Sequence, residues 1–314
     1  MATATIRINQ YFDESFASDA LAKAIGAKEK IKVVEILTNA NNAQRQMLKT
    51  PYKTKYGKDL IEELKKVFSG DFEDLVVSLM HTPAKYDAVE MNRALKGLGT
   101  NEKNLIEILS TRSNEEIEAC RNVYQTVYGK KLEDAVVSDT SGDFKKLLVI
   151  ALQAQKGRET WADSTGDSTK IIKSLDKKSG VDKFDAFKIF ATASPPHAVR
   201  VATEVERVSG KSFEKLVEKE LSGDFKNFVL ALVESARNTP RFLAAQINAA
   251  TKGFGTRDKD LIRVIVSRSE QDLALIEHEY ATVYGKSLVQ TIKEECKGEY
   301  RDGLLAVLKG NVRR

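Results

Sequence analysis

Apolar residues recur along the chain with a helical period. Stretches 72–79, 144–151 and 225–232 carry apolar side chains at positions i, i+3, i+4 and i+7, and stretch 300–308 carries them at i, i+4, i+7 and i+8. This spacing places the side chains on one face of an α-helix. A stripe of the same kind begins at Leu105, and no sustained alternation with period two indicates strands. We therefore predict an all-α fold.

Two short motifs recur four times, at a constant distance from each other. The first ends in Gly-Lys, and the second reads Ser-Gly-Asp-Phe or a variant of it, with its glycine thirteen residues after the glycine of the first. Such self-similarity indicates a repeat architecture. We predict four copies of one unit, each of about five short helices. The paired glycines are Gly57 and Gly70, Gly129 and Gly142, Gly210 and Gly223, and Gly285 and Gly298.

The register of these motifs sets the expected boundaries. The spacing between copies two and three is longer by nine residues, and the surplus falls in a polar stretch at 155–170 that is rich in small residues. We expect this stretch to connect two halves of the molecule, with Trp161 as a structural anchor or, alternatively, as a residue that faces a membrane. The predicted segments are an N-terminal segment at 1–15, repeats at 16–86, 87–158, 171–240 and 241–314, and a linker at 159–170.

Composition favours a soluble, cytoplasmic globular protein. The 314 residues are 42% hydrophobic, which is ample for a sizeable core, yet no run of eighteen apolar residues is present. The N-terminus lacks a signal segment. Cys120 and Cys296 are predicted to be free thiols. The 50 basic and 45 acidic residues are mixed along the chain, so we expect a mild preference for anionic partners but no nucleic-acid groove.

No residue pattern supports catalysis. The Gly-x-Gly stretches lack the Gly-Lys-Ser/Thr ending of a phosphate-binding loop and do not follow a strand. The three histidines have neither metal-ligand spacing nor a nucleophile beside them. We predict that the protein is not an enzyme.

Two glycine-rich stretches stand apart from the rest: Lys96-Gly97-Leu98-Gly99-Thr100 and Lys252-Gly253-Phe254-Gly255-Thr256. Each is followed, forty residues after its second glycine, by an acid, Asp139 or Glu295. Paired glycines let the chain turn sharply and point carbonyl oxygens outward, and Ca²⁺ accepts such oxygens readily. A turn that only starts a helix is the alternative for one loop, but two copies with matched acids favour calcium. With so few charges, a lipid phosphate is expected to complete the coordination.

A fourfold helical unit with Lys-Gly-x-Gly-Thr at the start of a helix and an acid some forty positions on resembles the annexins. The similarity runs from about Phe16 to the end, and it includes the Tyr-Gly-Lys and Ser-Gly-Asp-Phe motifs and Thr-Arg-Ser at 111–113 and 267–269. The resemblance implies a slightly curved disc of four five-helix units. It also implies calcium loops on the convex face that bridge to acidic phospholipid headgroups.

The resemblance also implies ligands, repeat by repeat. In repeat 2 they are the carbonyls of Leu95, Gly97 and Gly99 with the carboxylate of Asp139, and in repeat 4 those of Thr251, Gly253 and Gly255 with Glu295. In repeat 1 apolar residues replace both glycines and Val67 replaces the acid, so no such site is predicted. Repeat 3 keeps Gly180 and Glu220, but Lys178 replaces the first glycine. Calcium binding there is left open, and is expected to be weaker if present.

Further charged residues allow two readings each. Glu102 and Asp258 could form secondary calcium sites, but first-turn acids that favour the helix dipole explain them equally well, and that reading is preferred. Four other residues match positions that line a central polar channel in annexins. Because buried opposite charges must pair, an ionic lock between modules is preferred to an ion pathway. These four are Asp87, Glu90, Arg112 and Arg268.

The leading hypothesis is calcium-dependent, reversible binding to anionic phospholipid membranes, with phosphatidylserine-like headgroups, by a cytoplasmic protein that is peripheral on the membrane. Self-association on the membrane is compatible with this. The alternative is a structural or cytoskeletal scaffold with reduced calcium dependence, which the degenerate repeats 1 and 3 fit. Ion conduction rests on the charged centre alone. The N-terminal segment carries Tyr11 and Ser15 but no recognisable partner motif.

Overall fold

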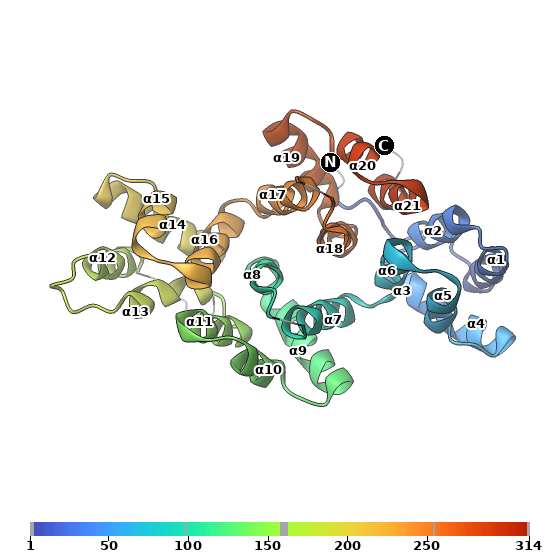
Figure 1. The fold of residues 1–314 in the computed structure, drawn as a ribbon, viewed down its shortest axis with the longest axis horizontal. Helices are drawn as coiled ribbons and strands as arrows, with labels where there is room; N and C mark the ends of the chain where they lie inside the picture. Colours follow the sequence, from blue (N-terminus) through green and yellow to red (C-terminus); the bar gives the residue numbers. More distant parts are fainter. Residues whose placement is uncertain (1–2, 98, 158–162, 254, 313–314) are drawn as a thin grey trace. The chain divides into compact units, whose positions relative to one another are not determined.

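The computed structural model describes residues 3–97, 99–157, 163–253 and 255–312. Within these ranges the regular elements are α-helices and one short 3-10 helix, and no strand is present. Figure 1 shows the helices in chain order. The all-helical prediction is confirmed.

The helices form four sets that overlap the expected repeats, although the first helices of repeats 2 and 4 begin at Pro83 and Thr239, before the expected starts at 87 and 241. Repeat 1 holds α1 (Glu14–Gly26), α2 (Lys30–Thr38), α3 (Asn42–Met47), α4 (Lys49–Tyr56), α5 (Leu60–Val67) and α6 (Gly70–Met80). Repeat 2 holds α7 (Pro83–Leu95), α8 (Glu102–Thr111), α9 (Asn114–Tyr128), α10 (Leu132–Asp139) and α11 (Gly142–Leu152). Repeat 3 holds α12 (Ser164–Ser174), α13 (Lys183–Phe187), η1 (Lys188–Ala191), α14 (Pro195–Ser209), α15 (Phe213–Glu220) and α16 (Gly223–Arg237). Repeat 4 holds α17 (Thr239–Thr251), α18 (Asp258–Arg268), α19 (Leu273–Tyr284), α20 (Leu288–Glu295) and α21 (Gly298–Lys309).

The recurring motifs act as helix boundaries. Gly129, in the first motif of repeat 2, ends α9 with a left-handed φ of 69°, a conformation that glycine adopts without a steric penalty. Thirteen residues later, Gly142 begins α11. In repeat 1 the third helix is divided at Leu48 into α3 and α4, three residues before Pro51, which lacks an amide hydrogen.

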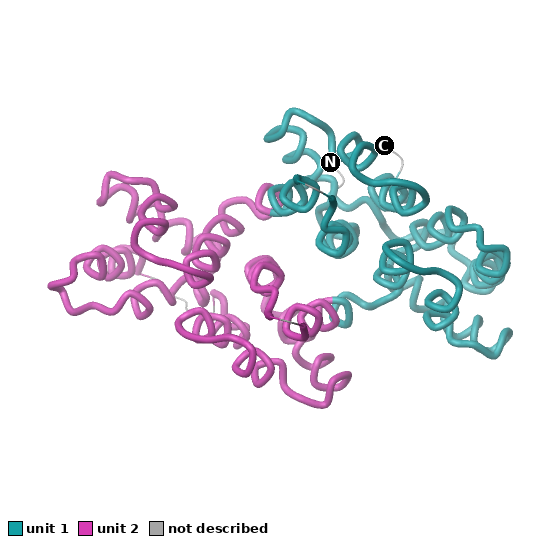
Figure 2. The backbone as a smooth tube through the Cα atoms, viewed as in Figure 1, with its two compact units in different colours: residues 1–86, 243–314 teal, residues 87–242 magenta. Residues whose placement is uncertain are grey.

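The chain forms two compact units (Figure 2). Unit 1 comprises residues Met1–Tyr86 and Leu243–Arg314, and unit 2 comprises Asp87–Phe242. Repeat 1 therefore packs with repeat 4, and repeat 2 with repeat 3. The stretch 155–170 lies inside unit 2, so it does not separate the two units, contrary to our expectation.

Part of the expected linker is also helical. Helix α12 begins at Ser164, where the carboxylate of Asp163 accepts a hydrogen bond from the Thr165 amide at 3.1 Å. Its buried side chains are Ser168, Ile171 and Ser174. Because two of the three are serines, the buried face of this helix shows no apolar pattern in the sequence. The prediction of a linker at 159–170 is therefore wrong from Ser164 onward, where α12 begins. Trp161 lies outside the described residues.

The last helix of each repeat lies in the core of its unit. In unit 1, α6 packs against α18 and α21, and in unit 2, α16 packs against α8 and α11. Most residues of the predicted stripes are buried, such as Leu75, Val76 and Leu79 of α6, each 0% exposed, whereas Phe225 and Tyr300 are half-buried. A Cβ on Gly303 of α21 would come within 2.7 Å of the Leu75 side chain. Glycine therefore allows α21 and α6 to approach closely.

Candidate calcium sites

The loop between α7 and α8 is closed by hydrogen bonds at its ends. The Asn101 amide donates to the Ala94 carbonyl at 2.8 Å, and the Asn101 side chain accepts from the Asn104 amide at 3.3 Å to cap α8. Gly99 has φ of 97°. A Cβ on Gly97 would lie 3.4 Å from the Gly99 carbonyl oxygen. The loop thus brings backbone oxygen close to a position that has no side chain, which suits a carbonyl cradle for a cation.

The loop between α17 and α18 repeats this construction. The Arg257 amide donates to the Ala250 carbonyl at 2.8 Å. Gly253 and Gly255 have φ of 112° and 87°, in the left-handed region that favours glycine. Residues Leu98 and Phe254, between the two glycines of each loop, lie outside the described residues. The predicted ligands Leu95 and Thr251 are the last residues of α7 and α17, and both are buried.

The structure brings each predicted acid to its loop. Asp139 and Glu295 are the exposed last residues of α10 and α20. The hydroxyl of Thr100 donates to the Asp139 carbonyl at 2.8 Å, and that of Thr256 donates to the Glu295 carbonyl at 3.3 Å. A threonine in each glycine loop therefore ties the loop to the end of the acidic helix.

The position of these acids is electrostatically unfavourable in the absence of a cation. The C-terminus of a helix carries partial negative charge, which disfavours a carboxylate there and favours a positive charge. Among the described residues, no group of three or more His, Cys, Asp or Glu could hold a metal. The donor set that the loops offer is instead one carboxylate with backbone carbonyls, and this set fits a hard cation such as Ca²⁺.

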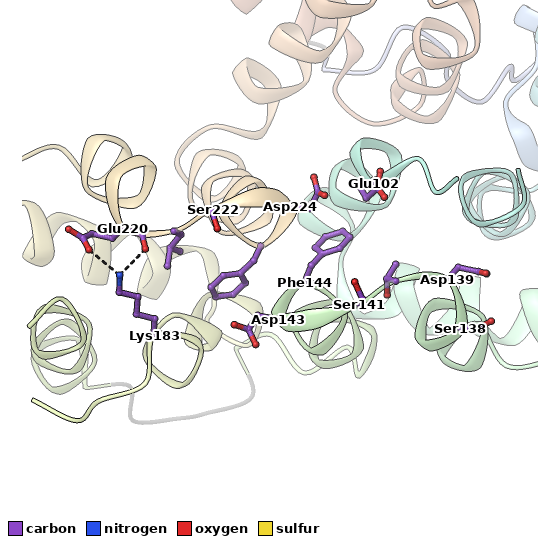
Figure 3. Close-up of a pocket in the computed structure, with 13 residues that line it drawn as sticks. Glu102, Ser138, Asp139, Ser141, Asp143, Phe144, Lys183, Glu220, Ser222 and Asp224 are labelled. Atoms are coloured by element: carbon purple, nitrogen blue, oxygen red, sulfur yellow. Dashed lines mark hydrogen bonds and ion pairs between the residues drawn. The ribbon is translucent and has the colours of Figure 1, made fainter. Parts of the chain in front are cut away.

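Repeat 3 differs because a lysine forms an ion pair with the acid at the helix end. The ammonium of Lys183 lies 2.9 Å from the Glu220 carbonyl oxygen and 3.0 Å from the Glu220 carboxylate (Figure 3). The Lys183 hydrogen bond holds the pKa of Glu220 below its usual range. Our sequence reading kept Glu220 as a candidate ligand and did not consider Lys183. The signal was present, since Lys183 stands three residues after Gly180, where repeats 2 and 4 have acids.

A polar cleft of about 720 Å³ in unit 2 joins the acid of repeat 2 to that of repeat 3 (Figure 3). Residues from α10 and α11 line one part of it, and residues from α13, α15 and α16 line the other. Its charged lining residues are Glu102, Asp139, Asp143, Lys183, Glu220 and Asp224. The cleft is therefore rich in carboxylates.

The residues predicted as secondary sites begin helices. Glu102 and Asp258 are the first residues of α8 and α18, where an acid favours the helix dipole. Burial raises the pKa of Asp258, and the nearby Asp71 carboxylate raises it further. The helix-start reading accounts for both positions, and their calcium binding stays a prediction.

The residues matched to a central channel form ion pairs within their own repeats. Arg112 donates to both carboxylate oxygens of Asp87, at 2.8 and 2.9 Å, and both side chains are buried. Glu90 is 0% exposed and accepts from Arg93 at 2.7 Å. The partners of Arg268 in unit 1 are the two carboxylate oxygens of Asp272, at 2.7 and 2.6 Å. The sequence reading missed Asp272.

None of the helices in the described part of the chain combines the length and the hydropathy that a membrane span requires.

Comparisons with known proteins cover nearly the whole chain. The sequence model of the annexin family matches residues 15–79, 86–151, 167–232 and 242–307. Annexin A5 of Bos taurus is 40% identical over 305 residues, which are 95% of both chains. Annexin A11 of Oryctolagus cuniculus is 40% identical over 96% of this chain, which spans 61% of that relative's length. The solved structure of annexin III matches with a TM-score of 0.92 and 37% identity, covering 98% of each chain. The chain therefore belongs to the annexin family, whose non-enzymatic members generally bind calcium and phospholipid membranes.

Proposed function

We propose that this annexin attaches reversibly to anionic phospholipid membranes through calcium held at the loops of repeats 2 and 4. The observation that carries the proposal is the placement of an exposed carboxylate at the C-terminus of α10 and of α20, tied by a threonine hydroxyl to a glycine loop. Two loops of one construction, far apart in sequence, share this unfavourable charge. A bound cation would relieve it in both.

The chemistry explains why lipid and calcium would act together. When bound, calcium supplies two positive charges and more coordination positions than one carboxylate and a few carbonyls fill. The exposed loops leave those positions open to phosphate oxygens of a headgroup. Each ligand then strengthens the binding of the other by the same factor. Attachment of this kind is peripheral, and it is reversed when calcium is removed.

The test removes both acids and keeps the fold. The variant Asp139→Ala/Glu295→Ala should lose calcium-dependent sedimentation with phosphatidylserine vesicles, because each loop then lacks the carboxylate at the end of its acidic helix. The matched control, Asp134→Ala/Glu294→Ala, removes exposed acids from the same two helices and should sediment like the wild type. Vesicles of phosphatidylcholine alone should sediment neither protein.

Undiminished sedimentation of the Asp139→Ala/Glu295→Ala variant would overturn the assignment. Equal loss in the control would show that the effect comes from net charge instead of from these two sites.

A further inference from the structure

We propose that Lys183 is a built-in cation that takes the place of calcium in repeat 3. This rests on the proposed function, since it concerns the counterpart of the loops in repeats 2 and 4. The inference starts from one contact: a single ammonium group reaches both the carbonyl oxygen and the carboxylate of Glu220, the last residue of α15. Figure 3 shows Lys183 crossing from α13 to that helix end.

Lys183 replaces the hydrogen bond that ties the other loops to their acidic helices. In repeat 2 the Thr100 hydroxyl donates to the carbonyl of Asp139. Val181 occupies the position of Thr100 in repeat 3, and a valine side chain has no donor. The Lys183 ammonium donates to the equivalent carbonyl, that of Glu220, at 2.9 Å. The loop and the helix end therefore stay joined, with a charged donor in place of a neutral one.

The same lysine also neutralises the acid. Its ammonium lies 3.0 Å from a Glu220 carboxylate oxygen, and Lys219 is a second cation at 3.6 Å. A positive charge at the C-terminus of a helix is favourable, both for the dipole and for the last carbonyl. In repeats 2 and 4 the same register position holds an acid, Glu102 or Asp258. Among the three repeats that keep the acid at the helix end, the charge at this position is reversed in repeat 3, where the cation contacts the acid of its own repeat.

Repeat 1 also has a lysine at this register, but without an acid at the helix end. Lys30 has the register of Lys183, but Val67 stands at the acid position. The ammonium of Lys30 lies instead near Glu299 of repeat 4, at 3.8 Å, and over the ring of Phe72, at 5.5 Å. Of these two lysines, the one that contacts the helix end is Lys183, whose repeat has an acid at that helix end.

The consequence is a repeat that is held closed without calcium. A calcium ion at Glu220 would have to displace an ammonium that already makes two contacts with this residue. Lys178 adds a second obstacle, because it places a positive charge at the register of Gly97 in this loop. Repeat 3 should therefore bind no calcium at concentrations that fill repeats 2 and 4.

Calorimetric titration with calcium tests the role of Lys183 with the loop glycine restored. Lys178→Gly is the control, and it should bind the same number of calcium ions per chain as the wild type. Adding Lys183→Met frees the Glu220 carboxylate while keeping an unbranched side chain, and the Lys178→Gly/Lys183→Met variant should bind one more. A gain in the control alone, or no gain in the double variant, would overturn the proposal.

A second experiment measures the contribution of Lys183 to thermal stability in the absence of calcium. In a calcium chelator, Lys183→Met should lower the thermal midpoint by roughly 2 °C or more, because the last carboxylate of α15 then loses the nearer of the two cations that contact it. Lys178→Met removes an exposed lysine of the same loop and should leave the midpoint unchanged; equal midpoints for the two variants would count against the proposal. This readout needs no calcium, so a wild type that bound none would refute the proposed function and leave the role of Lys183 open to this test.

Discussion

At the residue scale, Lys156 is a cation held at a helix end by backbone carbonyl oxygens. Its ammonium donates to the carbonyls of Leu109 and Arg112, at 2.8 and 3.3 Å, where α8 ends. The Asn114 side chain fixes the Lys156 backbone through bonds of 2.9 and 3.0 Å. Burial lowers the pKa of Lys156 to about 8, against a model-compound value of 10.5. A group in this position should make stability depend on pH.

The sign of that dependence is set by proton binding. Between pH 8 and 10.5 the unfolded chain holds a proton on Lys156 that the folded protein has released, so the contribution of Lys156 to stability rises with pH across this window. The total rise is about 3 kcal/mol at most. Urea unfolding at several pH values should show a difference between the wild type and Lys156→Met that grows in favour of the wild type from pH 8 to 10.5. A constant difference would contradict the prediction.

At the scale of elements, helices α10, α15 and α20 end in the same way but are joined to their loops by different side chains. Each helix ends in an acid and is joined to the loop of its own repeat, by threonine in two cases and by lysine in the third. The threonine keeps the carboxylate open to a cation, whereas the lysine occupies it. A change of two side chains, at Val181 and Lys183, thus changes what the element can bind.

The Thr100 hydroxyl should matter for calcium in repeat 2 alone. Thr100→Val removes the hydrogen bond that holds the loop at the Asp139 carbonyl before calcium binds, so the calcium dissociation constant of repeat 2 should rise, by at most roughly five-fold for a bond worth about 1 kcal/mol. A Glu295→Ala background isolates this repeat for calorimetry. Thr126→Val is the control, since the Thr126 hydroxyl donates within its own helix, to the Asn122 carbonyl at 2.9 Å. An unchanged affinity in Thr100→Val would contradict the prediction.

At the scale of the whole molecule, unit 1 joins the two ends of the chain. The amides of Thr5 and Ile6 donate to the Ser269 carbonyl at 2.8 and 2.9 Å, and both residues are 1% exposed. The Asn311 amide donates to the Thr5 carbonyl at 3.2 Å. The N-terminal segment is therefore packed against repeat 4, although its sequence showed no sign of this.

Gly310 is the residue that makes this packing depend on the absence of a side chain. Its φ is 57°, and a Cβ would lie 1.8 Å from the Thr5 carbonyl oxygen. Gly310→Ala should displace the N-terminal segment, so amide hydrogen exchange at Thr5 and Ile6 should accelerate, with a loss of stability of roughly 1–3 kcal/mol. Gly285→Ala also replaces a glycine of positive φ, 66°, but its ψ of 14° lies in the milder αL region and its Cβ would meet no atom within 4 Å. It should leave that exchange unchanged, and equal exchange in the two variants would contradict the prediction.

Features that depend on residues close together in the sequence could be predicted, whereas features that depend on other contacts were often missed. The stripes at Phe72 and Phe144 predicted helices correctly, because apolar periodicity is a local signal. The loops at Gly97 and Gly253 were found because two copies could be compared with their acids. Ser168 and Ser174 were missed because small polar side chains can be buried without an apolar pattern. Lys183 was missed because repeat 3 was compared with the other repeats at its glycines and its acid, and not at the register of Glu102 and Asp258.

The sequence by itself determined the helical repeats, their register and the residues of the two glycine loops, since turns, caps and amphipathic faces depend on neighbours within a few positions. Only the tertiary structure decided that repeat 1 packs with repeat 4 and repeat 2 with repeat 3. It also decided that Lys183, and not an open carboxylate, closes repeat 3. These are contacts between distant segments, and any of several partners would have satisfied the same local pattern.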